Sequence, residues 1–381
     1  MDFTIPEDLK AIQFGVREFV TKRVEPLAQQ IEEEDHIPSQ LVEEAAIMGL
    51  FGLSIPEEYG GLGLGVLGRA LVYEELGKTS NAFGSLIGAH TGIGSTGIVE
   101  MGSEELKRKY LPDMAAGRKI AAFALTEPQA GSDAARITTN AVKKGDRWIL
   151  NGQKQFITNG PVADIFTVFA VTDKSKGTKG ISAFVVEAGW KGFTKGAPEK
   201  KMGLRGSHTC QLFFEDVEVP EENLLGQEGL GYVAALKILT KGRATLAARA
   251  VGTMEKLIRL SVKYAKERVT MGKPLAEHQL IQAYLAEMAV DHAVSQAYAY
   301  KVAWMADQGL NVQKEAAIAK LFASEAFNRV ADKAVQIHGG MGYMREMEVE
   351  RVYRDARITK IYEGTNEIQR LIIAGKLLQE Y

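Results

Sequence analysis

The sequence predicts a mostly helical protein with a β insert in the middle of the chain. Apolar residues recur at helical spacing before residue 118 and after residue 229, whereas β-branched and aromatic residues gather in short runs between them. Turn signals separate these runs, which favours antiparallel hairpins. We therefore expect an N-terminal helical domain over residues 1–117, a middle antiparallel β-barrel over residues 118–229 and a C-terminal four-helix bundle over residues 230–381.

The N-terminal part contains two clear amphipathic segments. The first covers residues 5–35; Pro26 within it and Pro38 just after it are expected to mark helix ends. Ser39 is the expected N-cap of the second, SQLVEEAAIMGLFG. The stretch GLGVLG, residues 63–68, matches G-x-G-x-x-G, but no βαβ unit surrounds it. We interpret it as a glycine-rich loop between helices.

The middle and C-terminal parts differ in their residue patterns. Between residues 118 and 226, Lys-Gly-Asp and two Asn-Gly pairs supply residues that tolerate the positive φ of tight hairpin turns. After Gly231 the chain has three long, Ala-rich, periodic stretches that suit a helical bundle. There is no low-complexity linker, so we expect the modules to pack as one unit.

Composition narrows the classes of function. The 381 residues are 46% hydrophobic and 25% charged with a net charge of -2, which gives no electrostatic reason to expect nucleic acid or an anionic membrane as partner. The single cysteine, Cys210, permits no intrachain disulfide. The start resembles neither a secretory signal nor a transit peptide, and no apolar run could span a bilayer. We expect a cytoplasmic protein without a stable membrane anchor; a mature mitochondrial matrix protein would look the same.

Two motifs in the β region could contact a planar ligand. ALTEPQAGSD, residues 124–133, presents Thr126 and Ser132 in a loop with unobstructed backbone, although an ordinary strand exit has the same features. QKQFITNG, residues 153–160, puts Phe156 and Thr158 on one face of a strand. A core phenylalanine beside a β-forming threonine is the structural alternative. The six histidines show no paired spacing, and no C-x-x-C is present, so no structural zinc is expected.

Two motifs of the C-terminal part could contact a cofactor. KERVTMGKPLAEHQ carries Gln279 and Arg268, a planar cation suited to pyrophosphate, although it could equally be a solvated charge at a helix end. VQIHGGMGYM places Gly339 and Gly340 after a helix, where bare backbone could lie against a ligand or simply end the helix.

The stretch KIYEGTNEIQR holds the strongest candidate for a catalytic group. A helix is expected to begin near Asn366 with Thr365 as its N-cap, so Glu363 belongs to the preceding connection. A solvated carboxylate is the default interpretation of such a position. The flanking apolar residues argue for burial, which would raise the pKa of Glu363 toward that of a general base near neutral pH.

Taken together, these stretches resemble the acyl-CoA dehydrogenase family. ALTEPQAGSD, LNGQKQFITNG, QIHGGMGY and IYEGTNEIQR occur in the family's order along essentially the whole chain. GAHTGIG and FVVEAGWKGFTKGAPEKKMG are closest to the very-long-chain type, whose C-terminal membrane-associating region does not follow Tyr381. The resemblance implies the three-part fold expected above, FAD as cofactor, and a homo-oligomer, with a tetramer expected.

The resemblance also implies a reaction. A fatty acyl-CoA thioester would be oxidised to the trans-2-enoyl-CoA, with Glu363 removing the α-proton, flavin N5 accepting the hydride and an electron-transfer flavoprotein receiving the electrons. Some branched-chain members place the base just before an arginine of an earlier helix. Here that position is Gly242, before Arg243, which leaves Glu363 as the candidate.

Further contacts are implied position by position. Those to FAD are Thr126, Ser132, Phe156, Thr158, Arg268, Gln279, Gln336, Gly339, Gly340 and Thr365, of which Arg268 and Gln279 would reach the FAD of a neighbouring subunit. Those to CoA or the acyl group are Ser132, Arg243, Ser85, Gly88 and Ala89. The last three are small and lie where the floor of the acyl pocket is expected, so we expect depth for a medium to long acyl chain.

Two alternatives reuse the same scaffold. An acyl-CoA oxidase would pass electrons to oxygen, although such chains are typically much longer. A non-catalytic assembly or binding protein would need neither the flavin contacts nor the base.

Overall fold

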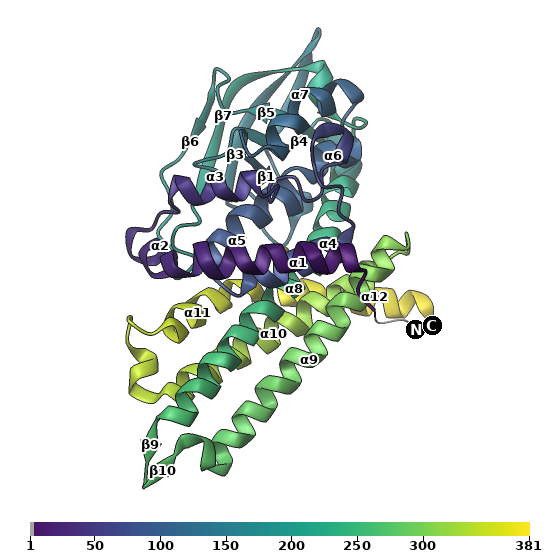
Figure 1. Ribbon diagram of the computed structural model, residues 1–381. Helices are drawn as coiled ribbons and strands as arrows, with labels where there is room; N and C mark the ends of the chain where they lie inside the picture. Colours follow the sequence, from purple (N-terminus) through teal and green to yellow (C-terminus); the bar gives the residue numbers. More distant parts are fainter. Residues whose placement is uncertain (1–3) are drawn as a thin grey trace.

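The computed structural model describes residues 4–381, with helices at both ends of the chain and a β-sheet domain between them (Figure 1). The helical elements of the first part are α1 (Glu7–Phe19), η1 (Val20–Val24), η2 (Glu25–Leu27), α2 (Ala28–Glu34), α3 (Ser39–Ile47), η3 (Glu57–Tyr59), α4 (Val66–Gly77), α5 (Asn81–Gly88), η4 (Ala89–Gly94), α6 (Thr96–Met101) and α7 (Glu104–Ala115). Two of them, η1 and η4, have π-helical hydrogen bonding.

The middle part is one eight-stranded sheet. Its strands are β1 (Ala121–Ala124), β2 (Asn140–Lys144), β3 (Arg147–Thr158), β4 (Ile165–Val171), β5 (Ile181–Glu187), β6 (Phe193–Lys195), β7 (Thr209–Pro220) and β8 (Leu224–Leu225). Short 3₁₀ turns lie between them at η5 (Ala134–Arg136), η6 (Lys174–Gly180) and η7 (Glu221–Asn223). The strand order is β6-β7-β3-β2-β4-β5-β8, with β1 beside β4.

The predicted antiparallel β-barrel needs correction, because the sheet is not closed. Its end strands, β6 and β8, do not pair with each other, and β1 runs parallel to β4. One residue pair, Asn140 with Val171, joins β2 to β4. The two halves pack face to face instead: the ring of Trp148 in β3 lies 5.5 Å from that of Phe184 in β5.

The predicted hairpin turns are partly correct. Lys-Gly-Asp does connect the antiparallel strands β2 and β3, with Gly145 at a φ of 62°. The Asn151-Gly152 pair is not a turn, because it lies inside β3 at a shift of register with β7. A glycine there accommodates a bulge: a Cβ on Gly152 would lie 2.6 Å from the Thr139 Cα.

The C-terminal part is helical, as predicted. Its elements are α8 (Gly231–Glu267), β9 (Val269–Thr270), β10 (Lys273–Pro274), η8 (Leu275–Glu277), α9 (Gln279–Asp307), α10 (Gln313–His338), η9 (Gly339–Tyr343), α11 (Glu348–Ala356), η10 (Arg357–Lys360) and α12 (Asn366–Glu380). The long helices α8, α9 and α10 pack on one another, and α11 and α12 pack against α10. The β9–β10 hairpin lies at the tip of this part, away from the sheet (Figure 1).

Helix ends agree with the sequence only in part. Thr365 is the N-cap of α12, as predicted, and its hydroxyl accepts a hydrogen bond from the Ile368 N–H at 3.3 Å. Ser39 is not a cap: α3 begins at this residue and Pro38 precedes it as the N-cap. Strands begin after α7 ends at Ala115, and α8 follows the last strand of the sheet; the domain limits at 117 and 229 stay predictions.

The N-terminal and C-terminal parts meet where α4 crosses α8. A Cβ on Gly252 of α8 would lie 1.8 Å from the carbonyl oxygen of Glu74, and one on Gly77 of α4 would lie 2.1 Å from that of Arg249. Glycine at both positions therefore permits backbone-to-backbone contact between the helices.

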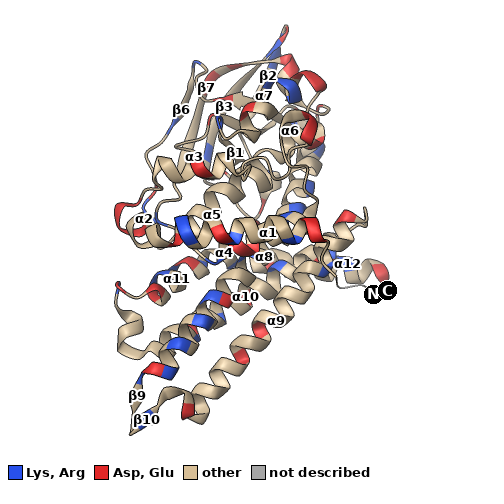
Figure 2. Ribbon diagram, in the orientation of Figure 1, with Lys and Arg blue, Asp and Glu red and all other residues tan. Residues whose placement is uncertain are grey.

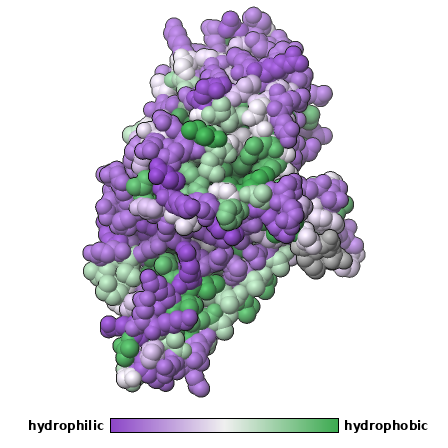
Figure 3. Space-filling view, viewed as in Figure 1, coloured by the Kyte–Doolittle hydropathy of each residue, from purple (hydrophilic) through white to green (hydrophobic). Residues whose placement is uncertain are grey.

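The outer surface mixes both signs of charge in the view of Figure 2. Hydrophobic surface is visible on both the upper part and the bundle (Figure 3). On α9, Leu280, Val290, Val294 and Trp304 are exposed. Among residues 4–381, no helix is both long and apolar enough to cross a bilayer.

We expect Gly252→Ala to lower the free energy of unfolding by about 2 kcal/mol or more, because the added methyl must separate α4 from α8. Urea unfolding measures this. The matched control is Gly375→Ala in α12, where nothing lies within 4 Å of the added atom. The control should be neutral or slightly stabilising. Equal stability of the two variants would contradict the proposed tight crossing.

Candidate active site

The connection before α12 holds Glu363 in an unusual backbone conformation. Glu363 has a φ of 53° and Gly364 one of 88°, so two successive residues are left-handed. A left-handed glutamate costs conformational free energy and persists only where its surroundings hold it. The Glu363 carbonyl accepts hydrogen bonds from Arg243 Nε at 3.3 Å and Gln369 Nε2 at 3.4 Å. The Gly364 carbonyl accepts one from Lys320 Nζ at 2.8 Å.

The carboxylate of Glu363 points into the protein. Its Oε2 is buried and has no hydrogen-bond partner among residues 4–381. A Cβ on Gly242 of α8 would lie 2.7 Å from this oxygen and 3.2 Å from Ile93 Cγ2 of η4. Gly242 therefore leaves the room that the carboxylate occupies.

Burial raises the pKa of Glu363 above its ordinary value, and the charges of Arg249, Arg243 and Lys320 oppose that rise. The pKa of Lys320 is in turn lowered to about 8 by burial, with Glu363 opposing the shift. The Glu363 N–H donates to no group among residues 4–381. A carboxylate oxygen that is buried without a partner can accept a proton from a ligand, while the free N–H of the same residue donates a hydrogen bond to that ligand.

The structure joins the two candidate motifs of the β domain at one point. The Gln155 N–H donates to the Thr126 carbonyl at 2.9 Å, which ties the ALTEP loop to β3. Phe156 follows in a left-handed bulge with a φ of 58°, and the residue is 65% exposed. Thr158 is half-buried, and Ser132 lies exposed farther along the loop. An uncovered aromatic ring at a strained position is typical of a ligand contact rather than of a core phenylalanine.

A buried ion pair beneath this loop was not anticipated. Lys154 Nζ lies 2.7 Å from Glu127 Oε1, and both side chains are almost fully buried. Burial opposes ionisation of Glu127, but Lys154 and hydrogen bonds from Thr138 and Thr139 outweigh it and lower its pKa to about 2. Burial lowers the pKa of Lys154 to about 8, so both groups are charged at pH 7. Glu127 lies in ALTEPQAGSD and Lys154 in QKQFITNG. One opposite charge in each of the two candidate motifs was the signal in the sequence that could have indicated this pair.

Five candidate cofactor residues lie elsewhere in the same chain. Arg268 follows the last residue of α8, 26 residues beyond Gly242, which corresponds to about 39 Å of helix. The rings of Tyr264 and His338 stack at 4.3 Å and so join the ends of α8 and α10. The residues at this tip are all exposed: Arg268, Gln279, Gln336, Gly339 and Gly340. One chain therefore does not bring them to Glu363.

The expected floor of an acyl pocket is not deep. Ser85 is buried, and Gly88 and Ala89 are half-buried. However, a Cβ on Gly88 would lie 3.1 Å from Tyr73 Cε1, so Tyr73 fills the room that the missing side chain leaves. Arg249 fills the corresponding room at Gly84, with its Cδ 3.4 Å from the position of a Cβ. Side chains from α4 and α8 thus lie in the room beside Gly88 and Gly84, so the missing side chains of these glycines do not by themselves support depth for a long chain.

Among residues 4–381, no cluster of three or more His, Cys, Asp or Glu side chains could hold a metal ion.

Comparison with protein-family models gives three matches that together cover most of the chain. Residues 6–118 match the acyl-CoA dehydrogenase N-terminal domain, residues 122–217 the middle domain and residues 229–378 the C-terminal domain.

Individual proteins match along their full length. The chain is 44% identical over 379 residues to the short-chain specific acyl-CoA dehydrogenase of Clostridium acetobutylicum, covering 100% of both chains. Butyryl-CoA dehydrogenase from Megasphaera elsdenii has a similar structure, with a TM-score of 0.96, 41% identity and coverage of 99% of this chain and 100% of that one. A chain from a structure described as an electron transferring flavoprotein of Acidaminococcus fermentans matches with a TM-score of 0.97 and 43% identity over 100% of both chains.

We expect Glu127→Gln to lower the free energy of unfolding at pH 7 by about 3–5 kcal/mol, because Lys154 is left buried without its counter-charge. The Glu127→Gln/Lys154→Met double variant should lose less of its free energy of unfolding, because no unpaired buried charge remains. Urea unfolding measures both variants. In the unaltered protein, the contribution of Glu127 is complete above pH 4.5 and is lost as the pH falls toward 2, because folding lowers its pKa. A single variant as stable as the unaltered protein would contradict this.

Proposed function

The chain belongs to the acyl-CoA dehydrogenase family, and from this premise we propose that it oxidises short-chain acyl-CoA thioesters to trans-2-enoyl-CoA with Glu363 as the base. The family makes it an oxidoreductase that acts on an acyl-CoA. One observation carries the proposal for the base: the buried Oε2 of Glu363 has no partner and lies against Gly242, where a side chain would displace it.

FAD is the cofactor that we assign, since a solved structure of the family contains it. The exposed ring of Phe156, beside Thr126 and Thr158, supports a flavin at this edge of the sheet. Ser132 and Thr365 are the further contacts proposed within the same chain. When bound, FAD supplies the acceptor for the hydride that leaves the β-carbon.

The residues of this chain account for the proton transfer. The Glu363 carboxylate removes the α-proton, and burial favours the protonated product of that step by raising its pKa. The Glu363 N–H is free to donate to the thioester oxygen, where charge develops as the proton leaves. Arg243 and Lys320 hold the loop through its carbonyls, so they position the base without bonding to its carboxylate. A CoA contact for Arg243 stays a prediction.

The expectation of a medium to long acyl chain is not supported. Tyr73 and Arg249 occupy the room above Gly88 and Gly84, which shortens the site at its inner end. The relatives compared above include a short-chain specific enzyme and a butyryl-CoA dehydrogenase rather than members of the very-long-chain type. Both observations favour a short acyl group.

Assembly and partners follow from where the remaining candidate residues lie. Arg268, Gln279, Gln336, Gly339 and Gly340 lie at the bundle tip, so they could contact FAD only in another copy of the chain. We therefore propose a homo-oligomer, with a tetramer expected. Exposed apolar residues on α9 support an interface. An electron-transfer flavoprotein is the proposed acceptor, supported by the Acidaminococcus match. A cytoplasmic location stays a prediction.

The proposed chain length is tested by anaerobic bleaching of the yellow holoenzyme with a series of linear acyl-CoAs from C4 to C16. We expect the fastest bleaching at the short end, because Tyr73 and Arg249 limit depth. Fastest bleaching by acyl-CoAs of C12 or longer would contradict the proposed short-chain preference. Rapid reoxidation by air would favour the oxidase alternative, and a colourless, unreactive protein would favour the binding protein.

Glu363→Gln should retain FAD and ligand binding yet slow flavin reduction by about 100-fold or more, because an amide cannot accept the α-proton. In the unaltered enzyme, the rate should rise with pH through the pKa of Glu363, which lies above its ordinary value of 4.5. Stopped-flow absorbance measures both. Unchanged reduction by the variant would remove Glu363 as the base.

Gly242→Ala should slow flavin reduction by about 10-fold or more, because the new methyl would displace the carboxylate of Glu363, and small misplacements of a reacting group are costly. The same stopped-flow measurement applies. Gly375→Ala, with open space at the added atom, is the matched control. Equal rates in the two variants would show that the carboxylate does not react from this position.

A further inference from the structure

Arg249 is a buried cation that forms no ion pair within residues 4–381. Its exposure is 7%, and the carboxylate of Glu363 interacts with it through charge but not through a hydrogen bond. Its one hydrogen bond within that range goes to the hydroxyl of Tyr362. A guanidinium carries five N–H donors, and a buried charge is expected to be paired. Most of the hydrogen-bonding capacity of this side chain is therefore unused.

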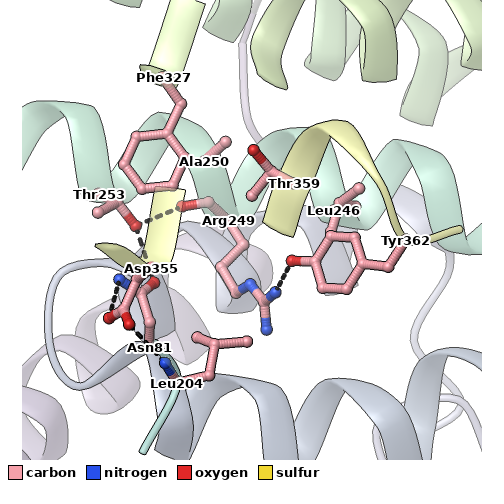
Figure 4. A pocket seen from close by; sticks show the side chains of 10 residues that line it. All are labelled: Asn81, Leu204, Leu246, Arg249, Ala250, Thr253, Phe327, Asp355, Thr359 and Tyr362. Carbon is pink, nitrogen blue, oxygen red and sulfur yellow. Dashed lines mark hydrogen bonds between the residues drawn. The ribbon is translucent and has the colours of Figure 1, made fainter. Parts of the chain in front are cut away.

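The nearest acidic side chain of the lining does not supply the partner. Asp355 borders the same small cavity, but its oxygens accept from the Leu204 N–H at 2.6 Å and from Asn81 Nδ2 at 3.4 Å. Figure 4 shows the guanidinium turned toward Tyr362 and away from Asp355. The hydroxyl of Tyr73, which lies near the guanidinium at Gly88, is hydrogen-bonded to that of Thr91 at 2.7 Å.

The position of Arg249 relates it to the base. Gly242, Leu246 and Arg249 follow at helical spacing on one side of α8, so Arg249 lies about 10.5 Å along the axis from the glycine that accommodates Glu363. Helical side chains lean toward the N-terminus, which brings the guanidinium back toward that glycine. Its Nη1 lies 3.6 Å from where a Cβ of Gly88 would be, on the expected floor.

We propose that Arg249 binds a carboxylate at the far end of the acyl group, so that the preferred substrate class is a short ω-carboxyacyl-CoA. This inference rests on the proposed function, because it needs the α-carbon at Glu363. A guanidinium presents two parallel N–H groups that match a carboxylate, and the pairing would satisfy donors that are otherwise unused. The reaction itself remains the removal of one α-proton and one β-hydride.

The same contact would act on the base. The charge of Arg249 is the largest of the three that lower the pKa of Glu363 against the effect of burial. A carboxylate bound to Arg249 would offset that charge and let the pKa of Glu363 rise. The pH at which flavin reduction reaches half its maximum should then be higher with an ω-carboxy substrate than with a neutral one.

The test compares two acyl-CoAs of similar shape: glutaryl-CoA and 5-methylhexanoyl-CoA, in which an isopropyl group replaces the carboxylate. We expect the holoenzyme to favour glutaryl-CoA by at least about 10-fold in kcat/KM, measured with a dye as electron acceptor. Arg249→Met should reduce this ratio by about 100-fold or more, because truncating one partner of a buried charge pair is costly. Arg249→Lys should keep part of the preference.

The control is Arg351→Met, which removes another buried arginine that pairs instead with Glu348 in α11. Its substrate ratio should equal that of the unaltered enzyme. A holoenzyme that favours the neutral substrate, or an Arg249→Met ratio that does not change, would overturn the inference. If Arg249→Met does not fold, the holoenzyme ratio and Arg249→Lys still decide. Butyryl-CoA distinguishes failure of this inference from failure of the proposed function. If butyryl-CoA bleaches the flavin but the enzyme does not prefer glutaryl-CoA to 5-methylhexanoyl-CoA, the dehydrogenase function stands and only the role of Arg249 fails.

Discussion

The contact between α4 and α8 is the constraint on which the inner end of the site depends. Gly77 lies against the carbonyl of Arg249, and Gly252 lies against that of Glu74, so each helix fixes the other at the level of the backbone. Tyr73 is one turn before Gly77 on α4, and Arg249 is one turn before Gly252 on α8. The crossing therefore sets both side chains that occupy the room beside Gly84 and Gly88. Packed backbones transmit such placement rigidly, because there is no flexible side chain between them to adjust.

The second constraint is electrostatic and concerns the pKa of Glu363. Burial raises the pKa of Glu363, and the charges of three nearby cations oppose that rise. Arg243 and Lys320 donate to carbonyls of the loop and not to the carboxylate, so they hold a left-handed backbone while leaving Oε2 unpaired. A direct ion pair would lower the pKa further and occupy the oxygen that, in the proposed reaction, accepts the proton. The arrangement would therefore hold the proposed base in position and leave its oxygen free to react.

Much of this could be predicted from sequence because it is local. The Thr365 cap and the position of Glu363 in a connection follow from a few neighbouring residues, and helical periodicity located the bundle. The open sheet and the parallel pairing of β1 with β4 could not be predicted, since both depend on which strands meet across long stretches of chain. The prediction of a deep acyl site was not supported for a similar reason. Gly88 suggests space in the sequence, but Tyr73 and Arg249 reach the space beside Gly88 and Gly84 from other helices. In an Ala-rich helix, nothing near Arg249 in sequence marks it as buried.

A charged group at the inner end of the site discriminates differently from an apolar one. An apolar floor distinguishes acyl groups by about 1–3 kcal/mol for each methylene that fits or does not. A short alkyl chain that ended beside Arg249 would instead leave a dehydrated guanidinium with most of its donors unpaired, which costs more than a missing methylene. The same residue that shortens the site thus makes its end polar. If both proposals hold, Arg249 would select the terminal charge of the acyl group and would limit its length together with Tyr73, and the crossing of two helices holds both side chains in place.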